Sequence, residues 1–174
     1  MYLPLAKDSE KNIRDLVSNY KDSGVFRCLY DGLNGKTDPV PEYFIDVNSL
    51  VLGNEKFQDK VKNFVLRSFP LSASDIIYAN DQGAAELAKK IQAEVEALGR
   101  QVCIVPVDEM PLVKTPTGIV VVAGSIQTGK SLLGISRKLR SIDNVPITYV
   151  VGFAKYNDPA SYNKLKRDLA FNNG

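Results

Sequence analysis

The chain has 174 residues, a length that fits one domain with a sizeable core. Its formal net charge is +2, with 44% hydrophobic and 24% charged residues, which gives no reason to expect a nucleic-acid or membrane partner. The chain contains no histidine, which excludes Ser–His and Cys–His nucleophilic catalysis and a histidine-ligated zinc site. Carboxylates, lysines, hydroxyls, backbone groups or a bound metal ion are left to carry any chemistry.

The sequence predicts a cytoplasmic protein. Its apolar runs have the length of strands, far below the roughly 20 residues that a membrane-spanning helix needs. The N-terminus has no basic start followed by a long apolar stretch, so we expect no signal peptide. The two cysteines, Cys28 and Cys103, do not form a CxxC pair, and we expect no disulfide. Cys103 lies in an apolar run and is expected to be a buried thiol.

The first part of the chain predicts two helices and two strands. Expected in order are a helix (9–20), a strand (25–30), a loop or wide hairpin turn (31–41), a second strand (43–47) and a helix (50–69). Ser9 is suited to the N-cap of the first helix, and Gly24 is suited to end it. The stretch between the strands is rich in Gly, Asn, Asp and Pro, which is typical of turns.

Strands and helices then alternate regularly. Expected in order are a strand (75–79), a helix (84–98) with Leu87, Ile91, Val95 and Leu98 inward, a strand (102–107), a loop (108–118), a strand (119–122), a helix (130–142), a strand (147–153) and a helix (161–171). The strands are continuous apolar runs, as in a parallel sheet covered on both faces. The sequence therefore predicts an α/β fold, taken as one domain over 1–174, with an N-terminal unit (1–70) and a sheet core (71–174).

One short loop carries most of the functional information. After a β-branched run that starts at Ile119, the chain reads Gln127-Thr128-Gly129-Lys130-Ser131 and enters an amphipathic helix. Successive backbone N–H groups at a helix N-terminus attract an anion, and the helix dipole favours it. A glycine permits close approach of the backbone, and hydroxyls and a lysine add donors. The sequence therefore predicts a phosphate-binding loop.

The same loop fits two kinds of protein. Read from Gly124, it satisfies G-x-x-x-x-G-K-[ST], the P-loop of nucleotide hydrolases. Such proteins need an acid at the end of another strand to organise Mg²⁺. The only later strand runs into Ala154 and Lys155, and the upstream candidate, Asp81, requires a permuted strand order. An atypical P-loop NTPase is therefore the less favoured interpretation.

The other interpretation rests on a resemblance over nearly the whole chain. Residues 121–131 resemble the ribose-5-phosphate loop of phosphoribosyltransferases. Residues 75–88, which include the turn Asn80-Asp81-Gln82-Gly83, resemble the strand, pyrophosphate loop and helix of the same enzymes. Residues 25–32 and 42–46, with Lys36 between them, are similar to the hairpin of the orotate phosphoribosyltransferase branch. The order and spacing of these segments together resemble the type I phosphoribosyltransferases.

This resemblance implies a central, mainly parallel sheet flanked by helices, with an N-terminal helix-and-hairpin hood. It implies binding of a phosphorylated ribose ligand, such as phosphoribosyl pyrophosphate or a nucleotide, with Mg²⁺, transfer to a nucleobase-like acceptor, and a homodimer or a partner protein. The implied cofactor-binding residues are Ser125, Gln127, Thr128, Gly129, Lys130, Ser131, Asn80, Gln82, Gly83 and Lys36. The implied catalytic residues are Lys114 and Asp81, and Asp81 is also the implied metal ligand.

The chain departs from the family pattern at two adjacent positions. The family carries two acids at the end of the strand before the phosphate loop, where they bind the ribose hydroxyls and lie near the positive charge that develops on the sugar. This chain has Ala123 and Gly124 there. A non-catalytic ligand-sensing or protein-interaction module derived from the fold is therefore a second hypothesis.

Simpler structural roles are open for several of these residues. Thr128, Ser131 and Asp81 are suited to cap helices, and capping is compatible with ligand binding. Asp108 and Glu109 are expected to lie in a solvated loop. The aromatic pair Tyr43-Phe44 is expected to pack in the hairpin rather than to stack on a base.

Overall fold

The computed structural model describes residues 9–31, 40–110, 115–140, 142, 145–155 and 159–171. Its elements are α1 (Ser9–Tyr20), the 3-10 helix η1 (Lys21–Ser23), β1 (Phe26–Asp31), β2 (Val40–Ile45), α2 (Val47–Gly53), α3 (Glu55–Ser68), β3 (Asp75–Tyr78), α4 (Gln82–Glu96), β4 (Cys103–Pro106), the 3-10 helix η2 (Val107–Glu109), β5 (Ile119–Ile126), α5 (Lys130–Leu139), β6 (Ile147–Ala154) and α6 (Pro159–Phe171). Across these residues, no helix combines the length and apolar character that crossing a membrane requires.

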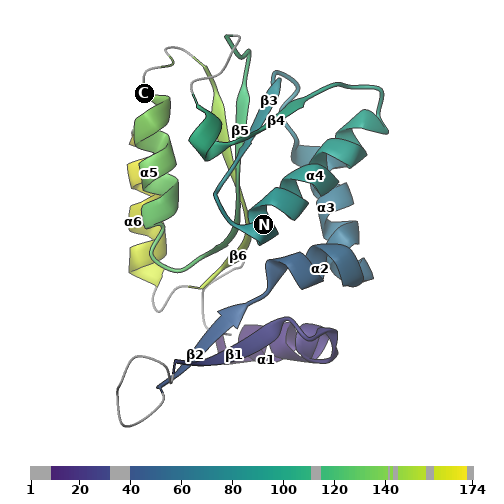
Figure 1. Ribbon diagram of the computed structural model, residues 1–174, viewed down its shortest axis with the longest axis vertical. Coiled ribbons are helices and arrows are strands. Elements are labelled where there is room, and N and C mark those ends of the chain that lie inside the picture. The colour runs from purple at the N-terminus through teal and green to yellow at the C-terminus, as the bar shows by residue number, and fades with distance from the viewer. Residues whose placement is uncertain are drawn as a thin grey trace.

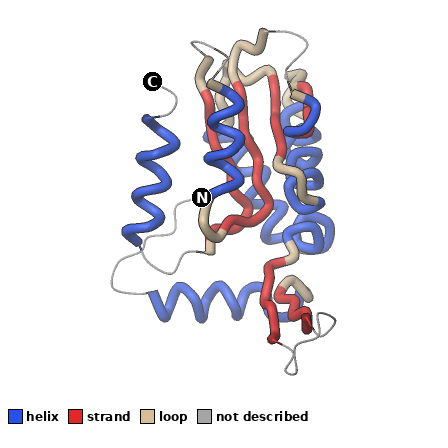
Figure 2. The backbone as a smooth tube through the Cα atoms, turned by 60° about the vertical axis from the view of Figure 1, so that its left-hand side comes forward, coloured by secondary structure: helices blue, strands red, loops and turns tan. Residues whose placement is uncertain are grey.

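The core is a four-stranded parallel sheet in the order β4-β3-β5-β6. Helices α3 and α4 lie on one side of this sheet, and α5 and α6 lie on the other (Figures 1 and 2). In the register, Ile76 of β3 lies beside Val120 of β5, and Val120 lies beside Thr148 of β6. This arrangement confirms the predicted α/β fold with helices on both faces.

The two faces of the sheet each build a hydrophobic cluster. Ile76, Val120 and Val122 point into the cluster that contains the apolar faces of α2, α3 and α4. Ile77 and Val121 point into the cluster formed with α5 and α6. Successive strand residues alternate between the faces, and both faces are covered, which is why these strands are apolar without interruption.

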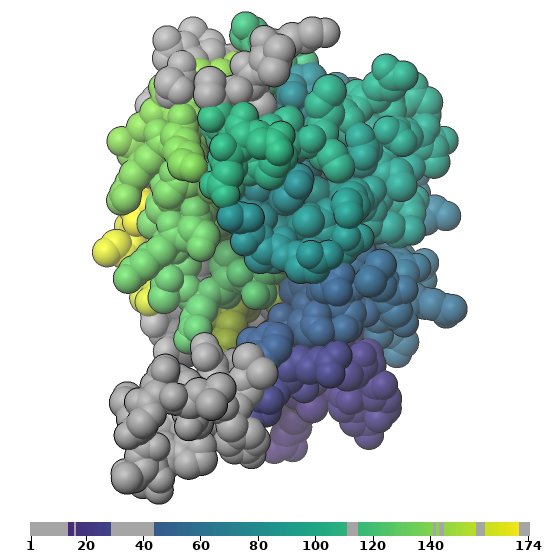
Figure 3. Space-filling view, viewed as in Figure 1, coloured from purple at the N-terminus to yellow at the C-terminus, as the bar shows by residue number. Residues whose placement is uncertain are grey.

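The antiparallel β1–β2 hairpin and α1 lie at one end of the sheet core (Figure 1), and the purple atoms of this N-terminal part lie at the same end in Figure 3. Asp46 joins this hairpin to α2. Its backbone N–H donates to the Val25 carbonyl at 2.7 Å, and its carboxylate caps α2 by accepting from the Ser49 N–H at 3.0 Å. The Arg27 Nε atom of β1 lies 3.4 Å from the same carboxylate. The Ser49 N–H, more than the Arg27 charge, holds the pKa of Asp46 below its ordinary value.

Several element boundaries differ from the predictions. The helix expected over 50–69 is two helices, because the Asn54 side chain accepts from the Phe57 N–H at 2.9 Å and starts α3 anew. Ser9 begins α1 as it is described, and the residue before it lies outside the described residues, so the predicted N-cap stays a prediction. Leu98 lies beyond the end of α4 and is 49% exposed, so it is not part of the inward face. Cys103 is exposed because it begins β4, the strand at the edge of the sheet, and the predicted buried thiol is wrong.

Candidate phosphate site

The loop between β5 and α5 has the backbone of an anion site. Gly129 is the N-cap residue of α5 and has a φ of +72°, in the left-handed region that favours glycine. No side chain caps this helix. The Lys130 N–H has only a weak contact, at 3.5 Å from the Thr128 hydroxyl. The first N–H groups of α5 are therefore available to an anion.

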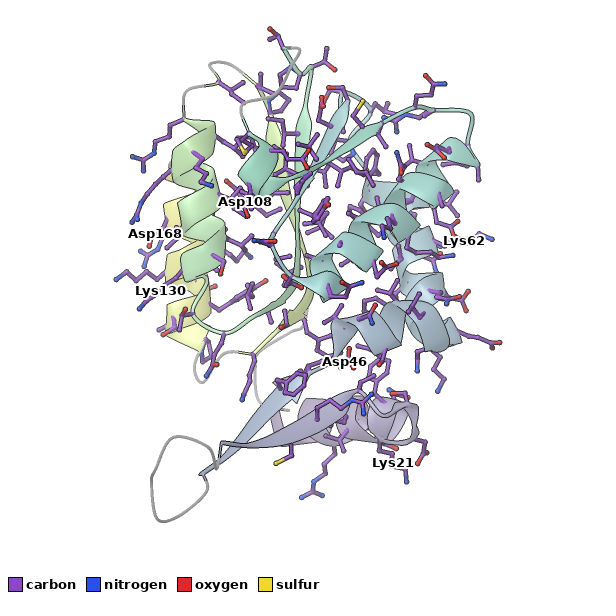
Figure 4. All side chains as sticks on the ribbon, in the orientation of Figure 1. Lys21, Asp46, Lys62, Asp108, Lys130 and Asp168 are labelled. Carbon is purple, nitrogen blue, oxygen red and sulfur yellow. The ribbon has the colours of Figure 1, made fainter. Side chains whose placement is uncertain are left out.

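Most side chains of this loop are exposed, whereas its glycine packs against α6. Gln127, Thr128, Lys130 and Ser131 are exposed, whereas Gly129 is buried. A Cβ at position 129 would lie 2.6 Å from the Leu165 side chain of α6, which shows how closely α6 supports the loop from behind. Figure 4 places Lys130 at the start of α5, at the end of that helix nearer to the hairpin. The predicted loop residues are thus brought together, with Ser125 exposed in the preceding strand.

The turn after β3 has side chains that are engaged within the protein. Asp81 caps α4, because its Oδ1 atom accepts from the Ala84 N–H at 2.7 Å, and the predicted capping role is confirmed. Asn80 donates to the Asp108 carboxylate at 2.6 Å. Asp108 in turn lies 3.9 Å from the Lys138 Nζ atom of α5. Because β3 and β5 are parallel neighbours, this turn and the phosphate loop follow strands that end at the same edge of the sheet.

The first turn of α4 packs directly against β5. A Cβ built on Gly124 would lie 2.6 Å from the Asp81 Oδ1 atom and 2.9 Å from the Ala84 backbone nitrogen. On the other side, a Cβ on Gly152 of β6 would lie 2.6 Å from the Gly124 carbonyl oxygen. The backbone at positions 124 and 152 can come this close to its neighbours only because neither residue has a side chain. An acid at position 124 would therefore displace the α4 cap.

Position 123 is also unfavourable for an acid. Ala123 is 1% exposed and belongs to the apolar cluster between the sheet and α5. A carboxylate there would be buried without a charged partner, which is costly. The packing around positions 123 and 124 therefore leaves no room for the acidic pair that the resemblance would place there.

A protein-held Mg²⁺ does not fit the described residues. They contain no group of three or more Asp, Glu, His or Cys side chains that could hold a metal ion. Asp81, the predicted ligand, is committed to the α4 cap. Binding of Mg²⁺ therefore stays a prediction, and it would depend on a bound ligand that supplies oxygen atoms to coordinate the metal.

The P-loop interpretation does not fit this backbone. The strand predicted to end at Val122 continues to Ile126, because it stays paired with β6 through Ala154. Gly124, the first glycine of the motif, is therefore inside a strand, whereas a phosphate cradle needs a loop there. Among the described residues, β6 is followed directly by Lys155 and not by an acid.

The remaining predicted residues have separate outcomes. Lys36 and Lys114 lie outside the described residues. Gln82 donates to Glu86 at 3.3 Å, and a Cβ on the buried Gly83 would lie 2.9 Å from Val47 of α2. Phe44 is 41% exposed. The buried Asn48 Oδ1 atom has no hydrogen-bond partner among the described residues. This atom was not predicted as part of the site, because no local sequence pattern indicates that α2 packs against the turn 80–83.

No protein-family model matches the chain, and no curated protein matches it. Among solved structures, the UMP synthase of Leishmania donovani matches with a TM-score of 0.55 and 18% identity, over 88% of this chain but only 33% of that one. The adenine phosphoribosyltransferase of Trypanosoma brucei, solved with AMP, pyrophosphate and ribose-5-phosphate, matches with a TM-score of 0.53 and 12% identity, over 86% of this chain and 70% of that one. An orotate phosphoribosyltransferase from Aeropyrum pernix is also matched, with a TM-score of 0.48 and 15% identity, over 90% of this chain and 98% of that one. The first two likenesses show that the chain has the type I phosphoribosyltransferase fold.

Proposed function

We propose that this chain binds a ligand with a 5-phosphorylated ribose, such as phosphoribosyl pyrophosphate or a nucleotide, at residues 127–131. The observation that supports this most is the N-terminus of α5, where a left-handed glycine stands at the N-cap and no side chain caps the helix. The shared fold adds support, since the matched adenine phosphoribosyltransferase was solved with ribose-5-phosphate.

The roles of the loop residues follow from their chemistry. Backbone N–H groups from Gly129 onward donate to the phosphate oxygens, and the helix dipole favours the negative charge. The exposed Thr128 and Ser131 hydroxyls add donors, and Lys130 supplies a positive charge. Ser125 and Gln127 lie beside them. In this proposal the turn 80–83 faces the pyrophosphate, and Mg²⁺ enters with that group.

A second candidate function is ligand sensing or partner binding without transfer. The close packing at Gly124 favours it, because the Asp81 cap leaves no room for a side chain at position 124, so this position cannot supply a carboxylate to the sugar. Displacement at the anomeric carbon develops positive charge, and its electrostatic stabilisation is a large part of catalysis. Transfer to a nucleobase-like acceptor would then require groups from elsewhere, such as Lys114 or a second subunit in a homodimer.

Calorimetric titration tests the proposal. The protein is titrated with phosphoribosyl pyrophosphate, ribose 5-phosphate and ATP, each with and without Mg²⁺. We expect the two ribose phosphates to bind, and Lys130→Ala to weaken binding by roughly tenfold, equal to about 1.4 kcal/mol. The matched control is Lys62→Ala, an exposed lysine that Figure 4 shows pointing outward from α3.

The outcomes separate the candidates. Binding together with pyrophosphate release in the presence of nucleobases identifies a transferase. Binding without release identifies the sensing function. If none of the three ligands binds, or if Lys130→Ala and Lys62→Ala affect their binding equally, the proposal is overturned.

A further inference from the structure

Helices α5 and α6 carry an excess of positive charge. Together they contain six basic residues and one acidic residue, Asp168, whereas the whole chain has 22 basic and 20 acidic residues. The rest of the chain is therefore net negative. The net charge of +2 averages over this separation, which is why composition alone gives no reason to expect an anionic macromolecule as a partner.

The two helices turn their outer sides in the same direction. They lie side by side on one face of the sheet (Figure 2), and Leu165 of α6 packs behind Gly129 at the start of α5. Both helices bury apolar side chains in the same cluster against the sheet, so their opposite sides face away from it together. Lys130 and Arg137 are seven residues apart, which places both on the outer side of α5.

Three exposed cations on this side are not engaged by other described residues. Arg137 of α5 and Lys164 and Arg167 of α6 are exposed, and their side chains make no ion pair within the described part of the chain. Lys138 differs from them, because its Nζ atom lies 3.9 Å from the Asp108 carboxylate. We call Arg137, Lys164 and Arg167 the outer basic face.

The surroundings of the outer basic face favour a phosphodiester backbone over a protein or a membrane. None of the described large apolar side chains that are exposed lies in α5 or α6. A protein interface has an apolar centre, and a helix that binds a membrane inserts an apolar face. A nucleic-acid backbone is bound by cations and polar groups alone. No described aromatic side chain of these helices is exposed to stack on single-stranded bases, so a duplex fits better.

We propose that the outer basic face binds the phosphate backbone of a nucleic-acid duplex without reading its base sequence. The 13 residues of α6 span about 20 Å, along which a DNA duplex carries roughly twelve phosphate charges. Arg137 and Arg167 each offer a planar guanidinium to phosphate oxygens, and Lys164 adds a point charge. This binding is additional to that of a phosphorylated ribose at residues 127–131 and does not depend on it.

The test measures the fluorescence anisotropy of a labelled DNA duplex and of a labelled RNA duplex as protein is added at low salt. We expect two unrelated base sequences to bind equally well. The slope of log K against log salt should be about −3, because each contacted phosphate contributes about −0.9. Binding of either duplex with these properties supports the proposal, and the tighter one identifies the kind of nucleic acid. The absence of binding to both overturns it.

Charge reversals locate the binding surface. Arg137→Glu and Arg167→Glu should each weaken duplex binding by roughly tenfold, whereas Arg137→Lys, which keeps the charge, should stay within about twofold. The matched control is Lys62→Glu, which makes a similar change of net charge on exposed α3, on the other face of the sheet (Figure 4). An equal loss in Lys62→Glu would show an effect of total charge alone and would overturn the proposal. A loss confined to Lys130→Ala would place the duplex at the phosphate loop and would also overturn it, as would equal competition by polyglutamate.

Discussion

The carboxylate of Asp81 lies over the backbone of Gly124, so that a Cβ at position 124 would stand only 2.6 Å from its Oδ1 atom. Asp81 caps α4 from the end of β3, and Gly124 belongs to β5. The absence of a side chain at 124 is therefore what lets α4 start where it does. The same contact leaves no room for a side chain at position 124, where the resemblance to phosphoribosyltransferases would place an acid.

A methyl group at this contact should destabilise the protein. We expect Gly124→Ala to lower the free energy of unfolding by about 1–3 kcal/mol, because its close neighbours include the Ala84 backbone, which cannot move aside as a side chain can. Urea denaturation gives this value. The control is Gly134→Ala in α5, where a Cβ meets nothing within 4 Å and a gain of about 0.5–1 kcal/mol is expected. A neutral Gly124→Ala would show that the contact is loose.

The capping role of Asp81 can be separated from its charge. Asp81→Asn keeps an oxygen acceptor for the Ala84 N–H, whereas Asp81→Ala removes it. We expect Asp81→Ala to cost about 1 kcal/mol in unfolding free energy and Asp81→Asn to cost much less. Thermal and urea unfolding of both variants would measure this. Equal losses in the two variants would contradict a role centred on the cap.

The phosphate loop should depend on its left-handed glycine. Gly129→Ala places a Cβ on a residue with a φ of +72° and toward Leu165, so we expect a loss of about 1–2 kcal/mol in stability and weaker binding of ribose 5-phosphate. Calorimetry and urea denaturation measure the two effects. Gly53→Ala, where a Cβ has open space, should leave binding unchanged. Unaltered binding in Gly129→Ala would argue against a site built on this backbone.

Acid should weaken the junction between the hairpin and α2. The pKa of Asp46 is lowered from its ordinary value of 3.8, first by the Ser49 N–H, so its ionised form stabilises the folded state. That contribution is present above the ordinary value and is lost as pH falls through the lowered one. We expect the stability difference between the wild type and Asp46→Asn to shrink as pH falls below 3.8. A difference independent of pH would contradict this.

The order of elements could be predicted from the sequence because the strands are uninterrupted apolar runs and the helices carry apolar stripes. The division of the helix predicted over 50–69 at Asn54 could not be predicted. The apolar pattern continues through this residue, and only the cap that its side chain makes interrupts the helix. The extension of β5 to Ile126 depends on pairing with β6, which no local pattern in Ala123 or Gly124 reveals.

The candidate site was predictable only in part. The loop 127–131 follows from its own residue types, and so does the Asp81 cap. The packing of α4 on Gly124 could not be predicted, because it joins segments far apart in the chain and depends on how the helix is placed on the sheet. The same holds for the contact between Asn80 and Asp108. Both contacts matter for the candidate site, because they involve the side chains of Asp81 and Asn80, which the resemblance implies would contact a ligand.

The most direct test of the phosphate loop is an NMR titration of the isotope-labelled protein with ribose 5-phosphate, with ribose as the control. We expect the backbone amides of residues 127–131 to shift progressively with ribose 5-phosphate and to stay unchanged with ribose. Shifts of the same size with ribose, or shifts confined to other parts of the chain, would contradict it.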